Sequence, residues 1–575
     1  MSHRAVARRR WIMPLPLPED RVAHLAESLG LPEDVCRILI RRGVDSADEA
    51  RTFLRPHLSL LNRPDDLPDI EPAVARVERA LAADEKILVH GDYDADGMSA
   101  AALLTLGLRA IGGRVEPFVP HRTRDGYDLS DAGLRRAGEI GATLIVTADC
   151  GVTATTAVKQ AAARGIDVVV TDHHRPGTDL PAAVAIVNPM LPGSRYPFRD
   201  LAGVGVAFKL LVALYENAGV DSPVLNQHLD LVALGTVADQ MPLTGENRIM
   251  VRAGLRVLER SRKPGLRSLL ANAGVRSEQG IDAQHISFKI APRLNSVGRM
   301  AEADVGVRLL LASDPREAQR LADHLERQNS ERRLTDARVF EEVTRKLETD
   351  LRVEDRAVVL WGDDWHPGVI GIVASRLVDR YHRPAVVIAF DRDIGRGSGR
   401  SVNGFHLFNA LQECAPLLER FGGHRMAAGL TVRRANVEEL AIRLREVASR
   451  ELSDREPVQE LRLDLEVPLK RVSSDLLKWL DHLAPFGSGN PHPILMVRGV
   501  ELDRPGRVGV DGGHLRLGLV RDDHRLPAIG FGLGSRMQEA RSTERADVAI
   551  EIAENSWNGR SEIQARVVDF RPAEH

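Results

Sequence analysis

Acidic and imidazole side chains gather in three short segments of this chain, HGDYDADG (90–97), TADCG (147–151) and TDHH (171–174). The candidate metal ligands within them are His90, Asp92, Asp94, Asp96, Asp149, Asp172, His173 and His174. Carboxylates that are brought together repel one another unless cations hold them. Mixed imidazole and carboxylate ligands without thiolate suit Mn²⁺, with Mg²⁺ as the alternative ion, and argue against a structural zinc site.

A pair of such ions would give this cluster a hydrolytic chemistry. Two ions about 3.5–4 Å apart can activate a water molecule and stabilise the leaving oxygen of a phosphodiester. The pair needs a bridging carboxylate, and a ligand from the central strand of a sheet is the natural candidate, which indicates Asp149. Each segment alone is also explained as a turn or a helix cap. The specific signal is the conjunction of all three.

Apolar runs in front of the three segments predict the elements that position them. The strand candidates are KILVH (86–90), TLIVTAD (143–149), DVVVTD (167–172) and AVAIVNP (183–189). The stretches between them with helical composition are residues 98–113, 129–141 and 153–165. This alternation predicts a parallel sheet that is covered on both faces. The carboxyl ends of parallel strands lie at one edge, so the three segments are expected to meet there.

The rest of the chain shows three other patterns. Residues 20–80 are typical of short helices joined by turns rich in proline and aspartate. Residues 314–351 are charged and periodic, which predicts a long helix that bridges two lobes. A second α/β unit follows, with strands at 357–363 and 384–390 and a helix between them. From about residue 456, short β runs separated by glycine and aspartate turns predict a small barrel.

Composition narrows the classes of function. The 575-residue chain is 43% hydrophobic and 28% charged, as in globular proteins with several domains. It contains no run of 18 or more apolar residues, and its basic N-terminus lacks a signal-peptide core. Three well-separated cysteines fit a reduced, cytoplasmic protein. With a net charge of −3, any binding to nucleic acid must come from a local basic surface.

The three segments, together with GTVADQMPL (235–243), resemble the motifs of the DHH phosphoesterases. Within that superfamily the RecJ branch is the most similar, over nearly the whole chain. Further segments that carry this resemblance are RRGVDSADEARTFLRPHL, PRLNSVGRM, WHPGVIGIVASRL, GRGSGRS, FGGHRMAAGL, PFGSGNPHP and SWNGRSEIQARVVDF. The resemblance implies an α/β multi-domain protein with an N-terminal helical segment (1–75), a DHH catalytic domain (76–312), a bridging helix (313–352), a DHH-associated domain (353–455) and an OB-like β-barrel (456–575).

The resemblance also assigns roles in the metal site. The ligands that it implies are His90, Asp94, Asp96, Asp149, His173 and Asp239. Asp149 would bridge the two ions, His90 and Asp94 would bind one of them, and Asp96 would bind the other. Taken alone, Asp239 would pass as the end of a helix. The implied catalytic residues are His174, Asp149 and Asp172.

Polar positions elsewhere are candidates for contact with substrate. They are Arg122, Arg299, Gln328, Ser398, Arg400, Gly423 and His424. Arg299 is expected in a turn flanked by glycine, and Ser398 and Arg400 in a GSGR loop that lets backbone approach a phosphate closely. In the resemblance these positions line the path of the strand near its 5′ end, and the GGHRMAAG segment meets a phosphate. Gln328 interrupts the apolar spacing of the long helix, so it faces either a DNA channel or solvent.

The resemblance implies a single-stranded-DNA-specific exonuclease that works from 5′ to 3′ and releases 5′-mononucleotides in DNA recombination and repair. It would use two Mn²⁺ ions, or Mg²⁺, per site. A single-stranded-DNA-binding protein and a recombination helicase are the expected partners, and no membrane contact is expected. The barrel would hold single strands, with Trp557 and Phe486 as the nearest candidates for stacking.

Two alternatives stay open at this point. A DHH phosphodiesterase that acts on short oligonucleotides or cyclic dinucleotides shares the metal motifs, but such enzymes generally lack the barrel and the N-terminal region. A catalytically inactive replication scaffold on the same fold is the second alternative, and the intact ligand set argues against it. Comparing activity on long and on very short strands distinguishes the exonuclease from the first alternative. Nuclease activity with Mn²⁺ would exclude the second.

Overall fold

The computed structural model describes the backbone of residues 9–573, except 123, 127, 221, 301–303, 351–354, 454–457 and 558–559. Side chains at 222, 299–300, 348–350, 556–557 and 560–561 also lie outside the description. The chain forms two compact units. The larger unit contains Trp11–Leu294, Ala303–Ala322 and Leu461–His575, and the smaller one contains Met1–Arg10, Asn295–Glu302 and Asp323–Glu460.

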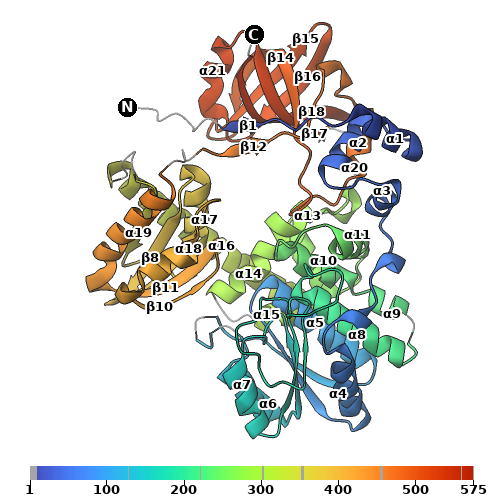
Figure 1. Cartoon of the computed structure of the whole chain (residues 1–575). Coiled ribbons are helices and arrows are strands. Elements are labelled where there is room, and N and C mark those ends of the chain that lie inside the picture. The colour runs from blue at the N-terminus through green and yellow to red at the C-terminus, as the bar shows by residue number, and fades with distance from the viewer. Residues whose placement is uncertain are drawn as a thin grey trace. The chain divides into compact units, whose positions relative to one another are not determined.

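A five-stranded parallel sheet lies at the centre of the first part of the larger unit (Figure 1). Its strands, in spatial order, are β3 (Arg114–Phe118), β2 (Lys86–Gly91), β4 (Leu144–Ala148), β5 (Asp167–Thr171) and β6 (Ala185–Val187). Its helices are α4 (Ile70–Ala82), α5 (Ala95–Ala110), α6 (Asp131–Ile140), α7 (Thr155–Ala163) and α8 (Gly203–Asn217). Helices α6 and α7 pack on one face, and α4, α5 and α8 lie on the other (Figure 1). The predicted α/β layering is confirmed.

The edge strand β3 is the one member of this sheet that the apolar runs did not predict. Its sequence RVEPF carries an arginine, a glutamate and a proline, and it pairs only with β2 within the described chain. An edge strand tolerates proline because one side of its backbone needs no partner strand. A search for continuous apolar runs therefore passes over it.

A helical layer follows the sheet along the chain. Its elements are α9 (Ser222–Asn226), α10 (Leu229–Ala238), α11 (Gly245–Glu259), α12 (Pro264–Asn272), α13 (Ala283–His285), the π-helix η4 (Ile286–Ile290), α14 (Ala291–Met300) and α15 (Asp304–Leu311). Helix α10 is buried from Leu229 to Val237. The expectation that Arg299 lies in a turn is wrong, because residue 299 belongs to α14. Buried Leu294 and Val297 keep this segment helical despite its glycine.

The smaller unit contains a mixed five-stranded sheet. Its strands, in spatial order, are β10 (Leu418–Gly423), β11 (Ala427–Arg433), β9 (Ile394–Arg400), β8 (Ala385–Asp391) and β7 (Val358–Gly362). Only β7 and β8 pair in parallel. The helices of this part are α16 (Pro315–Asp350), α17 (Ile370–Tyr381), α18 (Leu407–Glu413) and α19 (Val437–Glu451). The long helix α16 is divided between the two compact units. Its residues up to Ala322 belong to the larger unit, and those from Asp323 onward belong to the smaller one.

A closed barrel forms the C-terminal part of the larger unit. Its strands are β14 (Leu495–Val508), β15 (His514–Arg521), β16 (His524–Gly530), β17 (Ala546–Trp557) and β18 (Arg560–Pro572). Pairing runs β14–β15–β16–β18–β17 and returns from β17 to β14, which closes the cylinder. The short strand β13 (Leu465–Glu466) extends one edge, and the helices α20 (Ser474–Asp481) and α21 (Met537–Ser542) accompany it. The predicted barrel is confirmed.

The N-terminal helices share a hydrophobic core with this barrel. They are α1 (Glu19–Leu29), α2 (Glu33–Arg41) and α3 (Ala47–Leu54). Val35, Ile38 and Leu39 of α2 belong to the same buried cluster as Leu515 and Ile550 of the barrel. The first strand, β1 (Arg10–Ile12), pairs with β12 (Glu460–Arg462). Segments near the two ends of the sequence therefore fold as one piece.

Among the described residues, no helix combines the length and the apolar character that crossing a membrane requires.

Candidate metal centre

The loop after β2 begins the site by placing three aspartates at the carboxyl edge of the sheet. Asp94 caps α5, because its carboxylate accepts hydrogen bonds from the backbone N–H groups of Asp96 and Gly97, both at 3.0 Å. Asp96 is buried in the first turn of α5. Its carboxylate accepts hydrogen bonds from the backbone of Gly203 at 2.8 Å and Val204 at 3.0 Å. The N-terminus of α8 thus holds Asp96 in place, since it offers free N–H groups and a positive dipole.

Asp149 stands directly after β4 in a backbone conformation that favours glycine. Its φ is 65°, and its backbone N–H donates a hydrogen bond to the carbonyl of Thr171 on the neighbouring strand at 3.0 Å. The left-handed conformation is uncommon outside glycine, although aspartate and asparagine tolerate it best. A side chain at Gly203 would lie 2.4 Å from Asp149 Oδ1, so only glycine fits there. Tight packing therefore fixes the carboxylate at the tip of the sheet.

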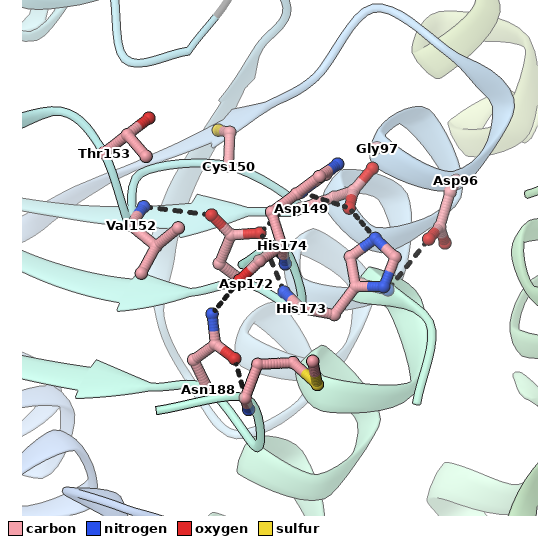
Figure 2. Close-up of polar contacts among 12 residues, drawn as sticks. Asp96, Gly97, Asp149, Cys150, Val152, Thr153, Asp172, His173, His174 and Asn188 are labelled. Atoms are coloured by element: carbon pink, nitrogen blue, oxygen red, sulfur yellow. Dashed lines mark hydrogen bonds and ion pairs between the residues drawn. The ribbon is translucent and has the colours of Figure 1, made fainter. Parts of the chain in front are cut away.

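Asp172 organises the tip of β5 (Figure 2). Its carboxylate accepts hydrogen bonds from the backbone N–H of Val152 at 2.9 Å, His173 at 2.7 Å and His174 at 3.0 Å. Oδ1 of Asp172, which accepts the bonds from His173 and His174, also lies 2.8 Å from Nδ1 of His174. Asp172 thus orients the imidazole of His174 and is itself fully engaged.

His173 connects the sheet edge to the end of α10. Its Nε2 lies 3.1 Å from Asp149 Oδ1 and 3.6 Å from Asp239 Oδ2. Asp239 occupies the C-cap of α10, and its side chain is 31% exposed, more than its buried partners. Asp239 is thus both a helix end, as its isolated sequence suggested, and a member of the cluster.

Three overlapping groups among the described residues have ligand atoms close enough to hold a cation. They are Asp92 with Asp94 and Asp149, Asp149 with His173 and His174, and Asp96 with His173 and Asp239. All ligand atoms within a group lie within 4.8 Å of one another. Asp149 joins the first group to the second, and His173 joins the second to the third. This sharing is the arrangement that a pair of ions with a bridging carboxylate requires.

Burial and mutual repulsion perturb the carboxylates strongly. Burial raises the pKa of Asp149 well above its usual range, and the charges of Asp96 and Asp94 add to this shift. The pKa of Asp96 is raised in the same way, by burial and by the charge of Asp239. Burial and the charge of Asp94 raise the pKa of Asp239 to about 7. Without a cation, these groups cannot all be ionised at neutral pH.

The pKa values of the two histidines are shifted in opposite directions. Burial lowers the pKa of His173 to about 4, and the nearby His174 charge contributes to this shift, so the ring is neutral at pH 7. Burial also disfavours the charged form of His174, but the hydrogen bond and charge of Asp172 outweigh it and raise the pKa to about 9. A neutral imidazole is the form that binds a metal, whereas a protonated one can donate a proton.

Two buried carboxylate oxygens of the site lack hydrogen-bond donors within the described part of the chain, and this fits a site for divalent cations. Asp92 Oδ1 and Asp149 Oδ1 are buried and accept no hydrogen bond from the described residues. A neutral His173 carries a single N–H and cannot satisfy both carboxylates that face its Nε2. Buried acceptors left in this way cost free energy unless a cation completes them. Oxygen and imidazole donors without sulfur suit Mn²⁺ and Mg²⁺.

His90 does not take part in these groups, in contrast to the ligand role that the resemblance implied. Its buried ring lies 5.3 Å from the Phe118 ring, and its Nδ1 lies 3.7 Å from the sulfur of Cys150. A Cβ at Gly133 would lie 2.6 Å from His90 Nε2, so the ring is wedged against the start of α6. Asp92 lies with Asp94 and Asp149 in the first group, while Nε2 of His90 is buried and has no hydrogen-bond partner among the described residues.

Two features of the site were missed in the sequence, and each had a signal. Asp92 was a candidate ligand from its place after the apolar run, but the resemblance gave it no ligand role. The backbone amides of Gly203 and Val204 hold Asp96, and their signal was the segment AGVGVAF, which is a glycine-rich start to an apolar helix. Backbone donors carry no side-chain signature, so spacing alone could not assign them to Asp96.

The candidate substrate residues of the larger unit lie in different surroundings. Arg122 is exposed, its guanidinium lies 5.0 Å from the centre of the Tyr93 ring, and its charge acts on Asp92. The side chain of Arg299 lies outside the described residues. Phe486 packs against the core that the barrel shares with the N-terminal helices, with its ring 4.1 Å from that of His492. Trp557 also has its side chain outside the description.

The candidate residues of the smaller unit lie on its sheet and on α16. Ser398 and Arg400 belong to β9, so the expected GSGR loop is wrong. Their side chains point to α17, because a Cβ at Gly371 would lie 3.0 Å from Ser398 Oγ and 3.3 Å from a guanidinium nitrogen of Arg400. Glycines alternate along this strand and pack against large apolar side chains, which explains why it resembled a loop in sequence. Gln328 is half-buried on α16.

Gly423 and His424 end the hairpin strand β10. Gly423 has a φ of 138°, and a Cβ there would lie 2.5 Å from the carbonyl oxygen of Ala427. The backbone N–H of His424 donates a hydrogen bond to that carbonyl at 2.8 Å, and the His424 side chain is exposed. The hairpin thus requires glycine and presents the histidine outward.

Comparison with known families agrees with this architecture. The model of the DHH family, N-terminal domain, matches residues 86–236, that of the DHHA1 domain matches 354–450, and that of the RecJ OB domain matches 463–569. The single-stranded-DNA-specific exonuclease RecJ of Bacillus subtilis is 36% identical over 98% of this chain and 71% of its own length. The chain belongs to the RecJ family. The RecJ of Dickeya dadantii is also 36% identical, over 94% of this chain and 96% of its own.

Solved structures of the RecJ family extend the likeness to three dimensions. RecJ from Thermus thermophilus in complex with Mn²⁺ superposes with a TM-score of 0.84 at 32% identity, covering 98% of this chain and 80% of that one. A RecJ exonuclease bound to manganese superposes at 0.60 with 36% identity, covering 69% and 98%. The Thermus protein was also solved with Mg²⁺. These are the two ions that the donor set of this chain suits.

Proposed function

We propose that this chain is a metal-dependent exonuclease that hydrolyses the phosphodiester bonds of single-stranded DNA. The carrying observation is the set of three linked ligand groups, in which one buried oxygen each of Asp92 and Asp149 accepts no hydrogen bond from the described residues. Membership of the RecJ family supports the substrate, because the curated relatives are single-stranded-DNA-specific exonucleases. The chain covers most of their length, including the barrel.

The residues of the site divide the work of hydrolysis. Asp92, Asp94, Asp96, Asp149, His173 and Asp239 would hold two divalent cations. When bound, such cations supply an activated water and neutralise charge on the phosphate. His174, protonated and oriented by Asp172, can donate a proton to the oxygen that leaves. This assignment keeps the predicted ligands except His90, which Asp92 replaces.

Direction and products are part of the same proposal. An exonuclease must recognise an end, and a terminal phosphate carries more charge than an internal one. Arg122, Arg299, Ser398, Arg400 and the hairpin at His424 are proposed to bind the strand near its 5′ end, with Gln328 as a further contact. This gives 5′-to-3′ degradation and release of 5′-mononucleotides. Arginine forks are well suited to a terminal phosphate because they bind it with two hydrogen bonds.

The cellular setting follows from the substrate. We assign the activity to DNA recombination and repair in the cytoplasm, with a single-stranded-DNA-binding protein and a recombination helicase as partners. The cysteines Cys36, Cys150 and Cys414 are free and buried, which fits a reducing compartment. Five domain segments with the boundaries given above complete the proposal, and the three family matches fall within three of them.

Digestion of end-labelled DNA tests the proposal. Single- and double-stranded substrates, each labelled at the 5′ or the 3′ end, are incubated with Mn²⁺, Mg²⁺ or EDTA. We expect degradation of single strands with either ion, none with EDTA, and little on blunt duplexes. Early release of a labelled mononucleotide from the 5′ end alone establishes polarity. Absence of any metal-dependent hydrolysis would contradict the proposal, and activity restricted to very short strands would favour an oligonucleotide phosphodiesterase.

A further inference from the structure

Only two aromatic side chains are exposed among the phenylalanines, tyrosines and tryptophans that the structure describes. They are Phe288, which is 77% exposed, and Phe531, which is 58% exposed. Aromatic residues make up only 4% of the chain, and all other described ones are buried or half-buried. Leaving a phenylalanine ring in water forgoes the free energy that burial provides. Both exposed rings lie in the larger unit, one in the helical layer and one on the barrel.

Phe288 is turned outward by a π-helix. The π-helical turn η4 joins α13 to α14, and its end residues Ile286 and Ile290 are buried at 0% and 1% exposure. Phe288 lies midway between them and faces solvent. Lys289 follows it and is exposed, and the guanidinium of Arg293 donates a hydrogen bond to the Lys289 carbonyl at 2.5 Å. Wide helical turns of this kind are rare and occur frequently at functional sites.

Phe531 extends an apolar strip on the outside of the barrel. It follows β16, on which Pro527 and Ile529 are half-buried and alternate with the inward-facing Leu526 and Ala528. Its ring meets the His514 ring edge to face, with centroids 5.2 Å apart. The backbone N–H of Gly532 donates a hydrogen bond to His514 Nδ1 at 3.2 Å, which holds the imidazole in position.

Arginines flank this strip on both neighbouring strands. Arg516 of β15 pairs with Ile529, and so does Arg566 of β18, and both arginine side chains are exposed. The face formed by the second and third strands of an OB barrel is where such barrels bind oligonucleotides. Here those strands are β15 and β16. The acids near this strip are Asp522 and Asp523, in the turn between β15 and β16, and Glu551 of β17, which pairs with Arg566 across the strands.

We infer that Phe288 and Phe531 are stacking points for the bases of single-stranded DNA. Each ring is exposed, and cations are available near it: Lys289 follows Phe288 in the chain, and Arg516 and Arg566 flank Ile529, two residues before Phe531. Unpaired bases stack on exposed aromatic rings while the phosphates pair with neighbouring cations, whereas the bases of a duplex are not available for stacking. This inference rests on the proposed function and extends it from cleavage to the way in which the strand is held.

Binding measurements on Phe288→Ala and Phe531→Ala test the inference. Fluorescence anisotropy with labelled single strands, in EDTA to prevent digestion, gives the dissociation constant of each variant. Loss of one stacking contact is expected to weaken binding about tenfold. Ile442→Ala, which removes a 56% exposed apolar side chain from α19, is the matched control and should bind like the unsubstituted chain. All three variants should keep the melting temperature.

Tryptophan at the same positions supplies a readout that a purely structural role would not change. Phe288→Trp and Phe531→Trp should restore affinity, and their added fluorescence should be quenched when the strand binds. Unchanged affinity in both alanine variants, or no quenching in either tryptophan variant, overturns the inference and would leave a protein partner as the ligand of these rings. Metal-dependent digestion by the unsubstituted chain is measured in parallel. If the unsubstituted chain digests DNA and the alanine variants bind as tightly as it does, only the stacking points are refuted. If the unsubstituted chain does not digest DNA, the proposed function is refuted.

Discussion

At the scale of single residues, the site stores electrostatic repulsion that cations relieve. The clearest contrast is between two aspartates at adjacent strand tips. Burial and like charges raise the pKa of Asp149, so its ionised form opposes folding at pH 7. Burial also disfavours the ionised form of Asp172, but the hydrogen bond and charge of His174 outweigh it and lower the pKa, so its ionised form supports folding. The two carboxylates should therefore respond to neutralisation with opposite signs.

Asp149→Asn should stabilise the metal-free protein and abolish hydrolysis. Asparagine keeps the size of aspartate and tolerates its left-handed backbone, while removing the unfavourable charge. A gain of about 1 kcal/mol would raise the melting temperature by roughly 2–4 °C. Mn²⁺ should then give little further stabilisation. Thermal melts with and without Mn²⁺, beside initial rates of digestion, check this.

Asp172→Asn is the matched control and should destabilise the metal-free protein at pH 7. Because the folded pKa of Asp172 is depressed, its contribution is present above the unfolded pKa and is lost as pH falls through the folded one. The melting temperatures of Asp172→Asn and of the unsubstituted chain should converge towards that acid limit. Destabilisation by both substitutions would mean that the contacts of the Asp149 carboxylate outweigh the repulsion it experiences.

His174→Gln should slow turnover while leaving metal binding intact. The imidazole is held by Asp172 at 2.8 Å and lies 3.8 Å from Asp149, where it can donate a proton during cleavage. Loss of such a donor typically lowers the rate by about 10²–10⁴-fold. Single-turnover rates at saturating Mn²⁺ measure the loss, and a Mn²⁺ titration followed by melting temperature measures binding. Equal weakening of metal affinity and rate would assign His174 to the ligands instead.

Arg400→Ala should slow digestion of 5′-phosphorylated strands much more than that of 5′-hydroxyl strands. A charge-assisted hydrogen bond contributes about 1.5–3 kcal/mol, so the loss should be roughly ten- to a hundredfold. The guanidinium also donates hydrogen bonds to Ser398 Oγ at 3.2 Å and to the Gly399 carbonyl at 2.8 Å. Ser398→Ala, which removes one of these acceptors, should have a smaller effect of the same kind. Equal slowing of both substrates would mean that Arg400 does not bind the 5′-terminal phosphate.

Much of the site could be predicted because its ligands follow apolar strands, and strand ends converge by the geometry of a parallel sheet. Asp149, His173 and Asp239 lie where convergence and resemblance placed them. The surroundings of His90 could not be predicted in the same way, since only packing against Phe118 and Gly133 reveals where its ring lies. Side-chain direction depends on neighbours distant in sequence.

At the scale of elements, glycine content explains why the GSGR segment and residue 299 were expected outside regular elements, and polar composition explains why β3 was missed. β9 is a strand although its sequence IGRGSGR suggests a loop, because its neighbours β8 and β11 supply the apolar side chains that fill the space above its glycines. Regular helices such as α16 were predictable, since periodicity alone determines them. The shared core of the N-terminal helices and the barrel left no such signal. Removing the chain from residue 456 onward would therefore also uncover α1 and α2.

Ile38→Ala, near the N-terminus, should destabilise the barrel. Ile38 is fully buried in the cluster that α2 shares with the barrel strands. Truncating such a side chain costs about 2–5 kcal/mol. Urea unfolding should show this loss, and affinity for long single strands should fall as the barrel opens. Leu15→Ala, at an 83% exposed position, is the control and should change neither. Destabilisation without any effect on strand binding would separate the N-terminal helices from the barrel.

At the scale of the whole molecule, the metal centre and the proposed strand contacts of β9 and the β10–β11 hairpin belong to different compact units. The larger unit holds the entire metal centre, and the smaller one holds β9 and the hairpin of β10 and β11. The net charge of −3 gives no general attraction for DNA, so binding must be assembled from local contacts. Strand binding should therefore respond to single substitutions more than to overall charge.

Mn²⁺ should stabilise only the larger unit. A ligand that binds the native state stabilises by RT ln(1 + [L]/Kd), about 2.7 kcal/mol at a hundredfold excess over Kd. Differential scanning calorimetry should show two transitions, of which Mn²⁺ shifts one. Asp149→Asn should suppress that shift and leave the other transition in place. A single transition that moves as a whole would mean that the two units unfold together.

The core shared by α2 and the barrel has a consequence for synthesis of the chain. Ile38 and its neighbours emerge from the ribosome well before the strands that bury them. Roughly 420 residues separate the end of α2 from the start of the barrel region, and at about 5–20 residues per second they take roughly 20–90 s to translate. During that interval α2 has α1 beside it but lacks the barrel strands of their shared core. Helix α2 therefore reaches its final packing late, and its apolar side chains need protection from aggregation while the nascent polypeptide grows.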